Sequence, residues 1–186
     1  MEIKNYKKQS LILVSLFLFG LSSWGGYRMY TSHYESKASE LFQQSKFTDV
    51  VSHYPRSQMA ILALMSLGQK AFEDGHYEEA IPYYSSARSS KRSSPIVKVG
   101  ATHQLALAYL KKGNPSEAEK LLEEISKDSA NKIPDYSKIL LARTYEVQGD
   151  LEKAKTLYKN LSEGTTLYSL REEAKERLNW LEKNQK

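Results

Sequence analysis

Polar and apolar residues alternate along most of the chain with the spacing of an α-helix. Between residues 58 and 181 the apolar side chains recur every three or four positions, and short segments with Gly or Pro separate these runs. Side chains at that spacing lie on one face of a helix. The pattern therefore predicts a series of short amphipathic helices, each burying one face against its neighbours.

One motif occurs three times in this region: a glycine that ends a helix, followed five residues later by an alanine. The three pairs are Gly75 and Ala80, Gly113 and Ala118, and Gly149 and Ala154. Glycine ends a helix readily because it adopts a positive φ at little cost. The glycines are 38 and 36 residues apart, close to the ~34-residue period of helix–turn–helix arrays. Such a period predicts stacked helix pairs, each covering the apolar face of the next.

Small residues occupy one matched position in each expected first helix, namely Gly68, Ala106 and Ala142. We expect the two helices of a pair to approach most closely there, where only a small side chain fits. These residues resemble the tetratricopeptide repeat, whose pattern is Trp-x2-Leu-Gly-x2-Tyr, then Ala-x3-Phe, then Pro. The three copies read Leu64-x2-Leu67-Gly68-x2-Ala71 with Ala80-x3-Tyr84, Thr102-x2-Leu105-Ala106-x2-Tyr109 with Ala118-x3-Leu122, and Lys138-x2-Leu141-Ala142-x2-Tyr145 with Ala154-x3-Tyr158. The opening Trp is absent from all three copies, and the closing Pro is displaced to Pro95 and Pro134.

The most apolar stretch runs from Leu11 to Leu21, and no charged residue follows before Arg28. It predicts a transmembrane helix over residues 11–30, since a membrane span needs about 20 apolar residues. The lysines before it would make residues 1–10 a cytoplasmic basic tail. The remaining chain would then be periplasmic, in a single-pass protein of the bacterial inner membrane. A cleaved signal peptide is the alternative interpretation of the same segment.

The expected fold is all-α: an N-terminal transmembrane helix, an α-solenoid of about three tetratricopeptide-like helix pairs and a C-terminal capping helix. Ser57 is placed to cap the first repeat helix, and Thr165 or Thr166 the closing helix. After residue 30 we expect a linking segment over residues 31–56, which is helical to about residue 54. The repeats follow over residues 57–164, divided into 57–94, 95–132 and 133–164. The capping helix is expected within residues 165–186.

This order of segments also resembles the bacterial inner-membrane proteins related to the ancillary subunit of the Sec translocon. The resemblance implies contact with periplasmic chaperones and a role in handling newly translocated proteins.

The sequence offers no set of residues suited to catalysis, to a cofactor or to a metal ion. The chain of 186 residues has no cysteine and four histidines, and no two of these histidines have the i, i+4 spacing of a helical metal site. Acidic pairs such as Glu123 and Glu124 lie among lysines, and adjacent residues of a helix point about 100° apart. We therefore expect a non-enzymatic protein without a cofactor.

Charge distribution argues against a nucleic-acid partner. Of the formal charge of +5, most lies in residues 1–30, and nucleic-acid binding needs cations gathered on one face of the folded domain. A second basic group, Arg88, Lys91, Arg92 and Lys98, occurs in the Ser-rich connection between the first two repeats. We interpret this connection as a hydrophilic loop. The alternative is contact with anionic lipid headgroups or with an acidic partner.

In the tetratricopeptide fold the first helix of each pair lines a concave surface that binds other proteins. By register, the inward residues here are Leu62, Met65, Gln69, Phe72, His103, Leu107, Leu110, Lys111, Tyr136, Ile139, Arg143 and Val147. Such a groove suits an extended or helical peptide segment, whether of a chaperone or of a membrane-complex subunit. The expected function is that of a membrane-anchored adaptor or chaperone-like scaffold in protein translocation or envelope assembly. The alternative is a fixed structural subunit of an envelope complex, with the groove filled by the chain's own terminal helices.

Overall fold

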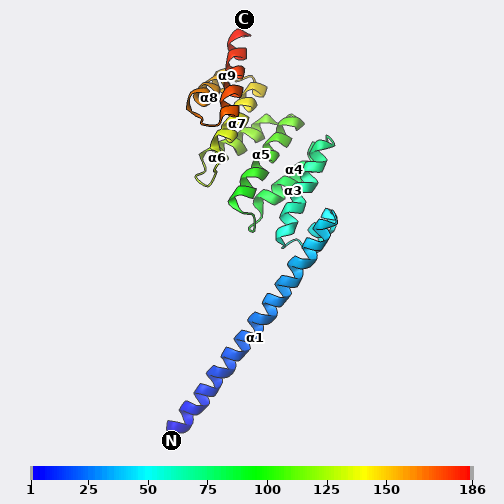
Figure 1. Cartoon of the computed structure of the whole chain (residues 1–186), viewed down its shortest axis with the longest axis vertical. Coiled ribbons are helices and arrows are strands. Elements are labelled where there is room, and N and C mark those ends of the chain that lie inside the picture. The colour runs from blue at the N-terminus through cyan, green and yellow to red at the C-terminus, as the bar shows by residue number, and fades with distance from the viewer. Residues whose placement is uncertain (1, 185–186) are drawn as a thin grey trace.

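The computed structural model describes residues 2–184, and their side chains from residue 13 onward. This part of the chain is all-helical, as predicted. Its helices are α1 (Glu2–Gln43), α2 (Phe47–His53), α3 (Gln58–Glu73), α4 (Tyr77–Ser89), α5 (Pro95–Lys112), α6 (Pro115–Lys127), α7 (Pro134–Gln148), α8 (Leu151–Gly164) and α9 (Tyr168–Lys183). A long α1 leads into a stack of shorter helices, and the two ends of the chain lie at opposite extremes of the molecule (Figure 1).

Consecutive helices of the stack pack as pairs, α3 with α4, α5 with α6 and α7 with α8, and each pair also packs on the next. The predicted solenoid is therefore confirmed. Gly68, Ala106 and Ala142 are buried between the helices of their pairs, as their small size predicted. The helix α9 repeats the same feature, because its Ala174 is fully buried 32 residues after Ala142. It therefore occupies the place of a further first helix and closes the stack.

The prediction of a transmembrane helix over residues 11–30 is wrong. Within the part of the chain whose side chains are described, no helix is long and apolar enough to cross a membrane. The segment is helical, as part of α1, but its strongly apolar run ends at Leu21, and Ser22, Ser23, Gly25 and Gly26 follow. Polar and small residues thus interrupt the ~20 apolar residues that a span needs. The side chains of residues 1–12, including the predicted basic tail, lie outside the described residues.

The helix expected over residues 31–54 is in fact two helices, the end of α1 and the short α2. They are separated at Ser45, which has a φ of 57° and is the non-glycine residue with positive φ in the described chain. Its N–H donates to the Phe42 carbonyl at 2.9 Å, and the Lys46 N–H donates to the Leu41 carbonyl at 3.0 Å. The turn at Gly75 is closed by two bonds at the same offsets, to Phe72 and Ala71, at 3.1 and 2.8 Å. Residues 44–46 therefore form a repeat turn with Ser in place of Gly.

A fourth helix pair thus precedes the three that the sequence predicted. Ala38 and Val50 are fully buried. Ala38, Val50 and Tyr54 each stand 30 residues before the matching residue of the next pair, which is Gly68, Ala80 and Tyr84 respectively. The interval is shorter than the later ones because α2 has only seven residues. Pro55 follows directly after Tyr54, and proline disfavours helical backbone at the residue before it.

Of the two predicted helix caps, one is confirmed and one is wrong. The side chain of Ser57 accepts a hydrogen bond from the Ala60 N–H at 3.0 Å and so caps α3. The helix α9 begins only at Tyr168, and its first turn has no side-chain cap. Thr165 is instead buried in the preceding loop, where its hydroxyl accepts from the Leu167 N–H at 3.3 Å.

Candidate binding surface

The first helices of the three predicted pairs, α3, α5 and α7, present one face that is not covered by the second helices. We call the predicted residues on this face the first-helix surface. Six of them are exposed: Leu62, Gln69, Lys111, Tyr136, Arg143 and Val147. Four are half-buried: Met65, Phe72, Leu107 and Leu110. The remaining two, His103 and Ile139, are buried and offer no surface to a partner.

A hollow of about 370 Å³ lies on this surface between α3 and α5, lined by Met65, Ser66, Gln69, Lys70, Glu73 and Gln104. The amide of Gln69 is held in place from both sides. Its oxygen accepts from the Tyr84 hydroxyl at 3.3 Å, and its nitrogen donates to the Glu73 carboxylate at 2.6 Å. This wall of the hollow is therefore polar and fixed, whereas Met65 makes another part of the wall apolar.

At the α7 end, the surface is tied to α9 by charged groups. Arg143 forms an ion pair with Glu173 of α9. Glu146, one turn further along α7, accepts hydrogen bonds from the Tyr158 hydroxyl and from Arg177 of α9. Burial and the neighbouring Glu146 carboxylate both raise the pKa of Tyr158, which stays a donor. Arg143 therefore faces a carboxylate of the chain itself, whereas Lys111 has no ion pair within the described residues.

His103 is buried between helices, although its position in the repeat predicted that it would lie on the binding surface. The side chain is 4% exposed because α7 lies over it. Its Nε2 lies 2.7 Å from the Ser137 hydroxyl, which also accepts from the Asn131 side-chain nitrogen at 2.9 Å. The ring of Tyr136 packs edge-on against the imidazole, with 4.9 Å between the ring centres. Burial lowers the pKa of His103 to about 4, so the ring is neutral near pH 7.

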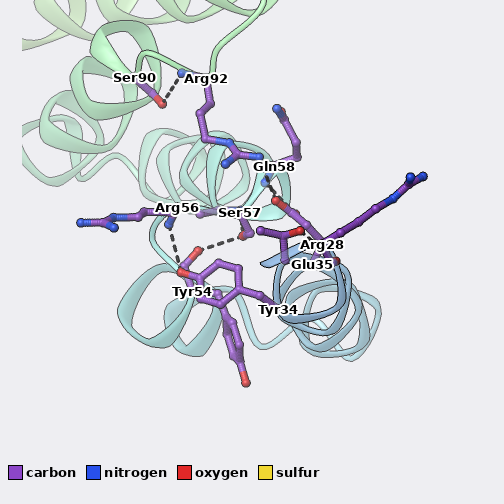
Figure 2. Close-up of polar contacts among 11 residues, drawn as sticks. Arg28, Tyr34, Glu35, Tyr54, Arg56, Ser57, Gln58, Ser90 and Arg92 are labelled. Atoms are coloured by element: carbon purple, nitrogen blue, oxygen red, sulfur yellow. Dashed lines mark hydrogen bonds and ion pairs between the residues drawn. The ribbon is translucent and has the colours of Figure 1, made fainter. Parts of the chain in front are cut away.

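A second surface feature was missed at the sequence level, because its residues are far apart in the chain. It is a cavity of about 410 Å³ where α1 meets the α2–α3 and α4–α5 loops. We call it the Tyr–Arg edge, after the lining residues Tyr27, Tyr30, Tyr34, Glu35, Arg56 and Arg92. Figure 2 shows Arg92 reaching from its loop to Glu35, whose ion pair has an N–O distance of 3.0 Å. One signal could have indicated it: the α2–α3 and α4–α5 connections contain Arg or Lys but no Asp or Glu. The sequence does not show that α1 lies beside them, because that depends on the turn at Ser45.

Backbone groups complete this edge. The Gln58 N–H, at the start of α3, donates to the Glu35 carboxylate at 3.0 Å, and the Arg56 N–H donates to the Tyr34 hydroxyl at 3.2 Å. The rings of Tyr34 and Tyr54 pack edge-on with 5.0 Å between their centres. Side chains of α1 thus satisfy two N–H groups near the first turn of α3, which have no partner within the helix.

The side chains at these places form contact surfaces on the outside of the helix stack. Throughout the described chain, no three His, Asp or Glu side chains converge in a group that could hold a metal ion. The surfaces described above consist instead of apolar side chains with fixed polar groups between them, and such surfaces recognise segments of other proteins.

Comparison with known proteins supports the interpretation of the helix pairs as a helix–turn–helix repeat array. Residues 71–140 match the protein family described as tetratricopeptide repeat. The matched segment is less than half of the chain and extends from the end of α3 to the first half of α7. Repeats of this class are generally non-enzymatic and bind other proteins, so the match supports an interaction scaffold. The search of curated proteins finds no match to this chain, and the narrower resemblance to the ancillary Sec translocon subunit is not confirmed.

Proposed function

We propose that this protein is a scaffold whose first-helix surface binds a segment of another protein. The observation that carries the proposal is that neither terminal helix lies across this surface. The helix α1 packs against α2 and α3, and α9 packs against α8 and α7. Both therefore extend the row of first helices at its ends and leave the surface between them open. This supports an adaptor over a subunit whose groove is filled by its own chain.

The chemistry of the surface indicates what kind of segment it takes. Val147 is 62% exposed and Leu62 is 39% exposed, although both are apolar. Burying such side chains against a partner removes apolar surface from water, which favours the complex. The fixed amide of Gln69 adds a hydrogen-bonding group between the apolar positions. We therefore expect an extended or helical segment with apolar side chains spaced along one face.

Site-specific photocrosslinking tests the proposal. A photoreactive residue is placed at Leu62, Gln69 or Val147 of the full chain, and the captured protein is identified by mass spectrometry. Matched controls carry the residue at Ser85 or Lys159, which are exposed on the second helices α4 and α8. We expect one partner to be captured from the first-helix positions and not from the control positions.

A second experiment links capture to binding. The substitutions Leu62→Asp and Val147→Asp change exposed residues, so the chain should still fold, which circular dichroism checks. Together they should weaken binding of the purified partner at least about tenfold, because each places a carboxylate in an apolar contact. Equal capture from the two sets of positions, or unchanged affinity of this variant, would overturn the proposed function.

A further inference from the structure

The Tyr–Arg edge has an unbalanced positive charge. Residues 54–58, which lead from α2 into α3, and residues 89–98, which lead from α4 into the first turn of α5, contain Arg56, Lys91, Arg92 and Lys98 and no Asp or Glu. Glu35 is the one carboxylate among the residues that line the cavity. Both of its oxygens are engaged, one by Arg92 and the other by the Gln58 N–H.

Of the other three cations, Arg56 lines the cavity, Lys91 precedes Arg92 in the α4–α5 loop, and Lys98 lies in the first turn of α5. None of the three has an ion pair in the part of the chain that the structure describes. Figure 2 shows the Arg56 side chain extending away from Glu35. Most other cations of the repeats differ in this respect. Lys112, for example, is paired with Glu78 at 2.9 Å and Arg88 with Glu124 at 2.8 Å.

Aromatic rings accompany this charge. Tyr27 and Tyr30 line the cavity and are 69% and 65% exposed. Tyrosine is enriched at protein interfaces because its ring buries apolar surface while its hydroxyl keeps a hydrogen bond. Arginine is enriched there as well, because its guanidinium binds carboxylates through two parallel hydrogen bonds. A cavity lined by tyrosines and the unpaired Arg56, with the unpaired Lys91 next to the lining residue Arg92, therefore fits a ligand that is both acidic and partly apolar.

We propose that the Tyr–Arg edge binds an acidic segment of a partner protein, with one large apolar side chain of that segment entering the cavity. Its carboxylates meet Arg56 and Lys91, and its apolar side chain packs between the tyrosine rings. This surface is separate from the first-helix surface, because it lies at the loops that connect the pairs. Nucleic acid does not fit equally well, since a phosphate backbone needs cations spread along a continuous face, and here they are confined to two short segments, residues 54–58 and 89–98.

Fluorescence anisotropy with the full chain tests this proposal. The probe is a labelled peptide of alternating Glu and Asp residues around one Phe, and the matched peptide has Gln and Asn in their place. We expect the acidic peptide to bind and the neutral peptide to bind at least about tenfold more weakly. Raising the salt from about 0.05 M to about 0.3 M should weaken the acidic peptide further, because exposed charges are screened.

A pair of matched variants locates the binding. Arg56→Gln with Lys91→Gln removes two cations of the edge and leaves the Arg92–Glu35 pair intact. Lys46→Gln with Lys159→Gln removes the same charge from exposed positions elsewhere. The first variant should bind the acidic peptide between about two- and thirtyfold more weakly, as expected for two exposed charge contacts, and the second should bind like the parent.

Several outcomes would overturn the proposal. They are absent binding of the acidic peptide, equal binding of the two peptides, and equal weakening in both variants. Another is binding to vesicles containing phosphatidylserine that depends on Arg56 and Lys91 while the peptide does not bind, which would assign the edge to a lipid surface. A chain with Val147→Asp should still bind the peptide, so this test is independent of the first-helix surface.

Discussion

The ring of Tyr84 lies directly against Gly68, and a Cβ atom at residue 68 would come within 2.7 Å of the ring carbon Cε1. Tyr84 is fully buried, and its hydroxyl reaches the Gln69 side chain. The close approach of α3 and α4 therefore depends on the missing side chain at residue 68. The matching positions of the later pairs have Ala106 with Leu122 and Ala142 with Tyr158, so only this pair needs glycine.

Substituting Gly68 by Ala should destabilise the fold by about 1–3 kcal/mol, because the added methyl group forces the buried Tyr84 ring to move. The better helix propensity of Ala offsets only about 1 kcal/mol of strain. Chemical denaturation measures the free energy of unfolding. Gly100→Ala is the matched control, since a Cβ there meets nothing within 4 Å, and it should be neutral or stabilising. A Gly68→Ala chain as stable as the parent would contradict the packing described here.

The substitution Ser45→Gly should raise the free energy of unfolding by about 1 kcal/mol. Ser45 adopts a φ of 57°, a left-handed conformation that costs a residue with a Cβ atom roughly 1–2 kcal/mol. Gly113→Ala makes the opposite change at a φ of 87° and should destabilise by a similar amount. Thermal unfolding of both variants checks the pair, and a loss of stability in Ser45→Gly would show that its side chain has another role.

Acid should destabilise the fold through His103. Its pKa is about 4 in the folded chain against an ordinary value of 6.5, so between these values the unfolded chain binds more protons. Stability conferred by the neutral, buried ring is complete above about pH 6.5 and is lost as the pH falls towards 4. The loss should reach about 3 kcal/mol.

Because carboxylates also titrate below about pH 5, the measurement compares the parent with His103→Gln at each pH. The difference between their unfolding free energies should shrink from pH 7 to pH 4. NMR titration of the imidazole gives the pKa directly, and a value near 6.5 would contradict this account.

Glu146→Gln should weaken the docking of α9. The carboxylate is 11% exposed and holds both Arg177 and the Tyr158 hydroxyl, so its neutral analogue loses a charge-assisted bond worth about 1–3 kcal/mol. Relative to the parent, hydrogen exchange of the Glu146→Gln chain should be accelerated more in α9 than in α5. Glu172→Gln removes a carboxylate from an exposed pair with Lys175 and should change stability by less than about 0.5 kcal/mol. Similar effects of the two substitutions would argue against a special role for Glu146.

The repeats were predictable because their chemistry is local. Gly75, Gly113 and Gly149 each have a positive φ, and the small residues at 68, 106 and 142 are buried between helices. The first pair escaped notice because Ser45 replaces the glycine and Val50 the alanine of the motif. Its spacing to Tyr54 matches that of the later copies and could have revealed it.

Other features depended on contacts between distant segments, which periodicity does not report. His103 was placed on the surface by register, yet Ser137 and Tyr136 of α7 cover it. The Tyr–Arg edge needs Glu35 and Arg92, which are 57 residues apart in the chain. The apolar composition of α1 predicts a membrane span, but the serines and glycines after Leu21 make its apolar run too short for one.

The position shared by Ala38, Gly68, Ala106, Ala142 and Ala174 has a consequence for how such a chain can grow. Since each of these helices docks through the same kind of small-residue contact, a duplicated copy of residues 95–132 inserted after residue 132 would find a compatible neighbour on either side. Lengthening the molecule would then require no newly invented interface, only the copying of an existing one.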